Sequence, residues 1–494
     1  MSQTVRTISP SNPFPSPHGP GQTPRGMRDW ALNTAGGLVG KSFLPALRGM
    51  EEAQWAGSEQ LKARTEQKLS PLLAHAARHV PFYRDYCRKH GIEPQQLRTA
   101  EDLRALPVLN KSDYRERGVQ EFFAENVPVH RRLERATSGS SGEPFGFVID
   151  RQAMPIIFAS HLFYDSWFGF RPFDRYIRIV SPPAAAPAVP RSAPLFFRYR
   201  QALTKKLQTW YETHTQEKIS VWDVDGQRAV EIWRRINAFR PDFILGYTST
   251  LSTIAGELLQ RNLRLFQPPR AVVTIAESLT PLRRQLIEEY FGTPVVDRYG
   301  LREFGSWSAQ SCPISVNSLH INPELVVCEI LRDDGQAAKA GEIGRVVLTD
   351  LHNYAMPFLR YFTGDLAVAG GTGCACGRGF PLIAEIQGRS IECLRTPSGK
   401  VLSPAILGHY LFVYHAQQDA VRHYQLIQES QDRVRLLVVP ASGWNEDCRQ
   451  HLHSTLASLL GDEFTTFVEA VSEIPLESSG KRSIIRVNAQ ASAA

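Results

Sequence analysis

The sequence predicts an α/β protein: a large N-terminal domain with parallel α/β sheets and a β-rich subdomain, then a small, mobile α+β domain. Three observations support this prediction. The chain has 494 residues, of which 43% are hydrophobic; this is ample for a buried core and too long for one ordinary domain. Segments with helical and strand periodicity alternate through its middle. Shorter strands separated by turns follow them.

The N-terminal part is predicted to be mainly helical, over residues 27–115. Residues 58–80 carry apolar side chains at helical spacing, and this helix should end before Pro81. Residues 153–170 predict a buried, aromatic-rich helix, and residues 176–180 predict a strand. The aromatic side chains of this helix could line a substrate site, but packing in the core is the favoured interpretation.

Helices and strands then alternate with the rhythm of a parallel sheet and its crossover helices. The predicted elements are helices at 230–239, 250–260 and 280–291 and strands at 241–247, 270–277 and 294–300. From about residue 321, strands and turns predict the β-rich subdomain, at 325–335 and 341–350. The last hundred residues contain three strand-like segments and one helical segment, which predict the small α+β domain.

Composition narrows the classes of partner. The net charge is +7, from 56 basic and 49 acidic residues, and the basic runs are short, so solvated surface is favoured over a nucleic-acid site. We find no apolar stretch long enough to span a membrane and no signal peptide, and we expect no membrane insertion. Seven cysteines, an odd number in a long chain, favour a reducing cytoplasmic setting over a disulfide framework.

A loop rich in small residues, TSGSSGEP at residues 137–144, precedes a strand-like run. Its backbone N–H groups and hydroxyls could wrap a phosphate. It lacks the Gly-Lys-Ser/Thr ending of a P-loop. Taken alone, this composition is more typical of a plain linker.

Four further segments follow this loop in a recognisable order. They are DRYGLREFG (297–305), YFTGDLA (361–367), QGRSIECL (387–394) and LESSGKRSIIRV (476–487). Together with the loop, they resemble the ordered motifs of the adenylate-forming superfamily, which includes acyl-CoA synthetases, aryl-CoA ligases, luciferases and adenylation domains. The segments RHVPFYRDY, LPVLNKSDYRE, TIAESLT and CACGR resemble those of its phenylacetate–CoA ligase and capsular polysaccharide biosynthesis branch.

The resemblance implies an ATP site. The loop residues that would close over the phosphates are Thr137, Ser138, Gly139, Ser140, Ser141 and Gly142. Tyr299, followed by Gly300, would stack on adenine, with Glu277 and Ser278 lining the same pocket. Asp365 would accept hydrogen bonds from the ribose hydroxyls, and Arg389 would assist at ribose or phosphate.

The resemblance also implies two catalytic residues. Glu303 would hold Mg²⁺, a hard cation that accepts carboxylate and phosphate oxygens. Lys481 would bridge the acid's carboxylate and the α-phosphate, where charge develops; a compact ammonium on a long stem suits that role. Taken singly, each of these residues is more simply interpreted as an exposed or turn residue.

Two departures from the superfamily pattern concern the loop and the hinge. Glu143 stands where many members have lysine, so phosphate binding must rely on backbone and hydroxyl groups. Ile391 stands where an acidic residue is usual, so the hinge residue stays open. We expect a disordered, proline-rich tail at 1–26, a large ATP- and acid-binding domain at 27–389, and a small lid domain at 390–494.

A second site is indicated by cysteines and one histidine: Cys312, His320, Cys374 and Cys376. Three thiolates and an imidazole make a closed tetrahedral zinc set. From the residues alone, scattered buried cysteines are the narrowly favoured interpretation, because Cys-x-Cys is less common than Cys-x-x-Cys and the two halves are far apart in the sequence. Some relatives in the branch carry zinc on such a set, which implies a structural Zn²⁺ site here.

The resemblance implies an AMP-forming ligase that activates a carboxylic acid, aryl or arylacetic, with ATP and Mg²⁺ and passes the acyl group to coenzyme A. The alternatives are transfer to a carrier-protein thiol or to an amine, as in natural-product or polysaccharide biosynthesis. A non-catalytic adenylate-binding protein is a third hypothesis, and Lys481 argues against it. The acid and the oligomeric state are left open; a homodimer is compatible with the sequence.

Overall fold

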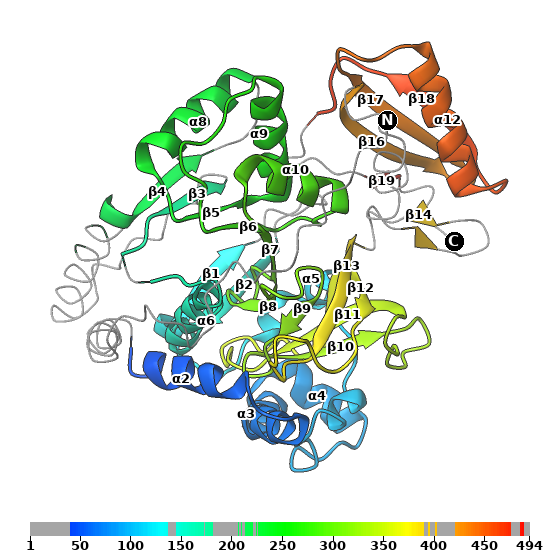
Figure 1. Cartoon of the computed structure of the whole chain (residues 1–494). Coiled ribbons are helices and arrows are strands. Elements are labelled where there is room, and N and C mark those ends of the chain that lie inside the picture. The colour runs from blue at the N-terminus through cyan, green and yellow to red at the C-terminus, as the bar shows by residue number, and fades with distance from the viewer. Residues whose placement is uncertain are drawn as a thin grey trace.

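The computed structural model describes most of the chain. The described residues are 40–136, 145–171, 173–180, 213–220, 226–389, 394–395, 401–402, 420–475 and 485–488, with the single residues 206, 209 and 224. The predicted tail at 1–26 lies outside them. Figure 1 shows a large lobe and a smaller lobe formed by the C-terminal part of the chain.

Helices form the N-terminal region, as the sequence predicts. They are α2 (Phe43–Ala53), α3 (Ser58–His79), α4 (Pro81–Lys89) and α5 (Lys111–Arg117), with short 3-10 turns at Asp102–Ala105, Val119–Phe122 and Val129–Arg131. In Figure 1, α2 and α3 lie in blue at the base of the large lobe. Helix α3 ends at His79, and the next residue, Val80, is extended, because a proline disfavours helical geometry in the residue before it.

The described strands of the large lobe include one eleven-stranded sheet, in the order β10-β11-β12-β13-β9-β8-β7-β6-β5-β3-β4. The strands are β3 (Tyr176–Val180), β4 (Gln216–Ser220), β5 (Phe243–Tyr247), β6 (Ala271–Ile275), β7 (Val295–Gly300), β8 (Trp307–Ser311), β9 (Leu319–Ile321), β10 (Val326–Leu331), β11 (Ile343–Asp350), β12 (Tyr361–Ala369) and β13 (Leu382–Arg389). Strands β3 to β7 pair in parallel. From β8 onward the pairing is antiparallel. The predicted β-rich part therefore continues the parallel sheet, because β8 turns back beside β7.

Helices cover both faces of the parallel strands. They are α6 (Met154–Ser166), preceded by a 3-10 turn at Arg151–Ala153, then α8 (Gly226–Phe239), α9 (Thr248–Gln260) and α10 (Pro281–Phe291). Alternate strand residues face opposite sides: Ile177 and Ile244 pack in the core formed with α8, α9 and α10, whereas Tyr176 and Phe243 pack in the core that contains α6. The predicted α/β fold class is confirmed.

The aromatic helix α6 belongs to the core. Phe163 and Tyr164 have no exposed surface, and Trp167 is 7% exposed. Their rings pack on one another and on Phe380. The structure thus confirms core packing as the main role of these side chains.

Two antiparallel strands flank the predicted phosphate loop. They are β1 (Arg132–Ala136) and β2 (Gly146–Asp150), and Ala136 pairs with Gly146. The loop residues 137–144 lie outside the described residues. Residues 132–136 and 146–150 are therefore the two arms of one antiparallel pair, on either side of that segment in the sequence.

A four-stranded sheet and one helix form the small C-terminal lobe, drawn in orange in Figure 1. The sheet order is β18-β17-β16-β19. The elements are β16 (Val421–Ser430), β17 (Arg433–Pro440), α12 (Glu446–Leu460), β18 (Thr465–Ala470) and β19 (Ile485–Val487), preceded by the short pair β14 (Leu394–Arg395) and β15 (Val401–Leu402). Its own core includes Leu426, Leu436 and Leu452. The domain boundaries given above stay a prediction.

Candidate active site and metal centre

The end of β7 contacts the middle of β12, although three strands separate them in the sheet order. The Tyr299 hydroxyl donates a hydrogen bond to Asp365 Oδ2 at 2.7 Å. Burial raises the pKa of the Tyr299 hydroxyl well above its usual value, and the neighbouring Asp365 adds to this effect. The hydroxyl therefore stays protonated and remains a donor.

Arg389 reaches the same place through its backbone. In the antiparallel pair β12–β13, Arg389 is the direct partner of Asp365. The backbone of β12 is shaped here by Gly364, whose φ of +86° favours glycine, and the Asp365 N–H donates to Thr363 Oγ1 at 3.1 Å. Three of the predicted residues, Tyr299, Asp365 and Arg389, thus come from three strands to one position.

Gly300 is required by close packing beside this position. A Cβ atom added to Gly300 would lie 2.8 Å from Cε3 of Trp307 and 2.9 Å from the carbonyl oxygen of Ser306. Both distances are shorter than real side chains allow. The glycine therefore lets β8 turn back against β7, next to Tyr299.

Glu303 lies just after β7 and is 3% exposed. Its Oε1 atom accepts a hydrogen bond from the Tyr361 hydroxyl at 2.9 Å. The same oxygen lies 2.9 Å from the Lys111 ammonium nitrogen. In the sequence, the segment around Lys111 indicates only a family resemblance. Nothing in it predicts the contact between Lys111 and Glu303.

Glu277 and Ser278 follow β6, the strand beside β7. The Glu277 carboxylate accepts hydrogen bonds from the Ser249 N–H at 2.7 Å and the Ser249 hydroxyl at 3.0 Å. It thereby binds orphan donors at the start of α9, and the backbone before it is left-handed, with a φ of 67° at Ala276. The Ser278 carbonyl faces Arg283 at 3.5 Å. Within the part of the chain that the structure describes, the hydrogen bonds of Glu277 and Ser278 lead to α9 and α10 and not to Tyr299.

Other predicted nucleotide and catalytic residues lie outside the described part of the chain. They are Thr137, Ser138, Gly139, Ser140, Ser141, Gly142 and Lys481. Their roles stay predictions.

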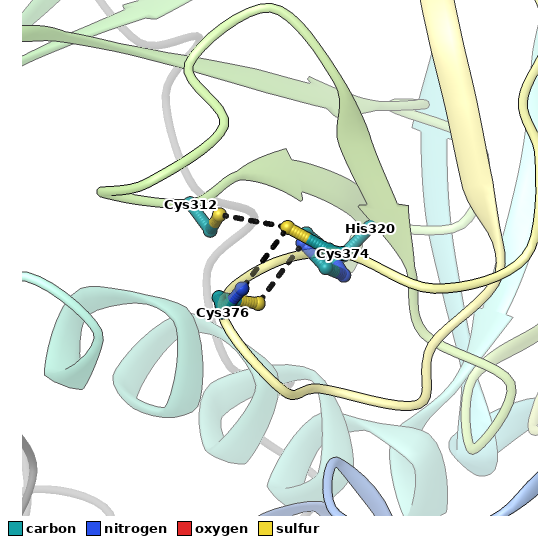
Figure 2. Close-up of side chains that lie close together, drawn as sticks. All are labelled: Cys312, His320, Cys374 and Cys376. Carbon is teal, nitrogen blue, oxygen red and sulfur yellow. Dashed lines mark hydrogen bonds between the residues drawn. The ribbon is translucent and has the colours of Figure 1, made fainter.

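The four predicted metal ligands come together in one cluster (Figure 2). Cys312 follows β8, His320 lies on β9, and Cys374 and Cys376 lie in the turn between β12 and β13. One potential ligand atom from each residue lies within 4.8 Å of the others. The alternative of scattered, unrelated cysteines is therefore wrong.

The spacing within this cluster suits a tetrahedral ion. The sulfurs of Cys312 and Cys374 are 3.7 Å apart, and Cys376 Sγ is 3.6 Å from His320 Nε2. Metal–sulfur bonds of about 2.3 Å place tetrahedral ligand sulfurs about 3.8 Å apart. His320 thus turns Nε2 toward the cysteine sulfurs. The donor set and its geometry fit zinc.

The thiols of the cluster differ in acidity. A hydrogen bond from Cys312, together with contacts from His320 and Arg378, holds the pKa of the Cys376 thiol well below its usual value. The same contact and burial raise the pKa of Cys312. One thiol is thus already poised as a thiolate, the form that ligates metal.

Arg378 connects this cluster to the N-terminal helices. Its guanidinium carbon lies 4.1 Å from the ring centre of Trp167 and 5.1 Å from that of Trp55, and its Nε donates to Gln54 Oε1 at 3.0 Å. Three thiolates, one neutral imidazole and a divalent ion would carry a net negative charge, which this buried cation offsets. The sequence motif contained Arg378 but not its partners.

No helix of the described residues is long and apolar enough to cross a membrane.

The sequence of this chain is similar to those of several known proteins. Residues 394–488 match the family model described as the CapK C-terminal domain. A phenylacetate–coenzyme A ligase of Thermus thermophilus is 26% identical over 75% of this chain and 78% of the relative; that of Escherichia coli is 27% identical over 76% and 81%. Protein CapK of Staphylococcus aureus is 23% identical over 60% and 61%.

Solved structures share the fold. A 2-hydroxyisobutyryl-CoA ligase in the postadenylation state, in complex with 2-HIB-AMP, superposes with a TM-score of 0.70 at 18% identity, over 89% of this chain and 92% of that one. The same ligase in the thioesterification state, with 2-HIB-AMP and CoA, gives 0.54. By sequence, the chain is thus similar to phenylacetate–coenzyme A ligases and to CapK, and it shares the fold of an adenylate-forming coenzyme A ligase.

Proposed function

We propose that the protein is an AMP-forming ligase, which activates a carboxylic acid with ATP and transfers the acyl group to coenzyme A. The observation that carries the proposal is that residues at and just after the end of β7 contact β12 at two points: Tyr299 bonds to Asp365, and Glu303 bonds to Tyr361. Relatives named as phenylacetate–coenzyme A ligases align over most of the chain. The arrangement therefore supports a nucleotide site with an acid site beside it.

Each residue has a proposed task at this site. Asp365 would accept hydrogen bonds from the ribose hydroxyls, and Tyr299 would stack on adenine. Arg389 would contact ribose or phosphate, and the loop 137–144 would close over the phosphates. Lys481 would bind the reacting carboxylate and α-phosphate oxygens during adenylation.

Glu303 fits a magnesium ion by the chemistry of its donor atoms, because both carboxylate oxygens are hard ligands. Among the described residues, Tyr361 and Lys111 both contact Oε1. Oε2 would therefore be the oxygen that binds the ion. A bound Mg²⁺ would neutralise phosphate charge and orient the triphosphate. The structural contribution of the chain is to hold this carboxylate in one orientation.

Coenzyme A is the favoured acceptor. The named ligase relatives and the superposed ligase are coenzyme A ligases, so a carrier-protein thiol or an amine is not favoured. The phenylacetate ligases favour an aryl or arylacetic acid as the substrate class.

An exchange assay tests this function. Purified protein, Mg²⁺, ATP and labelled pyrophosphate are combined with a panel of aryl, arylacetic and short aliphatic acids. We expect acid-dependent incorporation of label into ATP, and thioester formation when coenzyme A is added to the active acid. Nucleotide binding without exchange for any acid would instead support the non-catalytic hypothesis.

We further propose a structural zinc ion at Cys312, His320, Cys374 and Cys376. Four soft or borderline ligands leave no open position for substrate, so the ion would hold structure. It would join β8, β9 and the β12–β13 turn, and through Arg378 it would brace the N-terminal helices.

Zinc content gives the corresponding prediction. Purified protein should contain about one zinc per chain, and Cys374→Ser and Cys376→Ser should each lower both zinc content and thermal stability. Turnover per folded molecule should fall less. Cys448→Ser is the matched control, since Cys448 is buried in the C-terminal lobe beside the Gly443 carbonyl. Zinc-free protein from zinc-supplemented cells, purified without chelators, would refute the site.

A further inference from the structure

The backbone just before Lys111 is fixed next to Glu303, the proposed magnesium ligand, by two hydrogen bonds of Leu109. The Leu109 N–H donates to the Arg360 carbonyl at 3.1 Å, and the Phe362 N–H donates to the Leu109 carbonyl at 2.8 Å. These bonds fix the chain against the start of β12, on either side of Tyr361. Lys111 then begins α5.

The start of α5 is itself rigid. The Asn110 side chain accepts hydrogen bonds from the Ser112 N–H at 2.7 Å and from the Asp113 N–H at 3.4 Å, and the Asn110 backbone N–H donates to Asp113 Oδ2 at 2.7 Å. This reciprocal arrangement is a capping box. The Lys111 backbone therefore has little freedom, and its side chain extends to Glu303 from a fixed base.

Lys111 and Tyr361 share one oxygen of Glu303. Both contacts, at 2.9 Å, are made to Oε1, and the carboxylate side chain is only 4% exposed while that of Lys111 is 36% exposed. A buried carboxylate without a charged partner is strongly disfavoured. Lys111 supplies that charged partner, and two donors on one oxygen set the rotation of the carboxylate.

We propose that Lys111 is a positioning residue for the metal: together with Tyr361 it holds Glu303 turned so that Oε2 is left to bind the magnesium that would come with ATP. The inference rests on the proposed function and assigns a role to the N-terminal helical region. Lys111 acts through Glu303 in this proposal, not by direct contact with phosphate. Partners behind a metal ligand commonly change metal affinity by about 10–100-fold.

Calorimetry can separate these two modes of action. The probe is an α,β-methylene analogue of ATP, titrated into the full-length protein once with Mg²⁺ and once with a chelator. In wild type, Mg²⁺ should tighten binding. Lys111→Met should reduce that metal-dependent gain by about tenfold and leave the affinity in chelator unchanged. Lys111→Arg should restore part of the gain, because it keeps a cation near Oε1.

A double substitution tests the route through Glu303. In a Glu303→Gln background, Lys111→Met should cause no further loss of metal-dependent binding. An equal loss in both backgrounds, or weaker binding in chelator, would mean that Lys111 contacts the nucleotide itself and would overturn the proposal. Lys62→Met is the matched control, because Lys62 pairs with Glu101 at an exposed position.

The outcomes also separate this inference from the proposed function. Circular dichroism before titration establishes that each variant is folded. If the wild-type protein binds no nucleotide, the proposed function and the inference both fail. If wild type shows the metal-dependent gain and folded Lys111→Met shows the same gain, the inference alone is overturned.

Discussion

Lys481→Ala is expected to lower acid-dependent pyrophosphate exchange by on the order of a hundredfold or more. Lys481 occupies the motif position of the adenylation lysine, where its ammonium would meet charge that develops in the transition state. Losing one such contact typically has an effect of this size. The measurement is exchange with a verified substrate acid at saturating ATP.

Binding and folding should survive this substitution. The affinity for ATP should change little, because the lysine acts on the transition state. Thioester formation from preformed acyl adenylate should also persist, since the role proposed for Lys481 lies in the adenylation step. Lys339→Ala, at an exposed position between β10 and β11, is the control. Exchange at the wild-type rate in Lys481→Ala would remove Lys481 from the site.

Asp365→Ala should weaken ATP binding by tenfold or more. Two ribose hydroxyls would lose a carboxylate acceptor, and hydrogen bonds to charged groups contribute about 1.5–3 kcal/mol each, where about 1.4 kcal/mol corresponds to a tenfold change. Calorimetric titration of ATP, with Mg²⁺ present, measures the effect. Unchanged affinity in the folded variant would contradict the ribose role.

Tyr299→Phe separates ribose recognition from local structure. Asp365 accepts a hydrogen bond from the Tyr299 hydroxyl, so Asp365→Ala also removes this contact. The phenylalanine variant loses the same hydrogen bond but keeps the aromatic ring and the carboxylate. Its ATP affinity should therefore fall much less than that of Asp365→Ala.

The sequence alone was sufficient for features that depend on local chemistry. The end of α3 before Pro81 follows from the steric effect of proline on its neighbour, and α8, α9 and α10 follow from the spacing of their apolar residues. Both signals lie within a few residues of the element they predict. The identities of the candidate nucleotide and metal residues likewise came from ordered local motifs.

Tertiary structure decided which of these residues touch. Tyr299 and Asp365 lie 66 positions apart in the chain, and their contact depends on how β7 and β12 meet. Glu277, predicted as a pocket residue, proves to bind the start of α9. Lys111, Glu303 and Tyr361 converge because a short bridge fixes the N-terminal region on β12. The periodicity of apolar residues indicates which face of a helix or strand is buried. Which other element packs against that face depends on residues far away in the sequence. For this reason the sequence could predict the candidate nucleotide and metal residues, but not the side chains, such as Lys111 and Tyr361, that hold them in position.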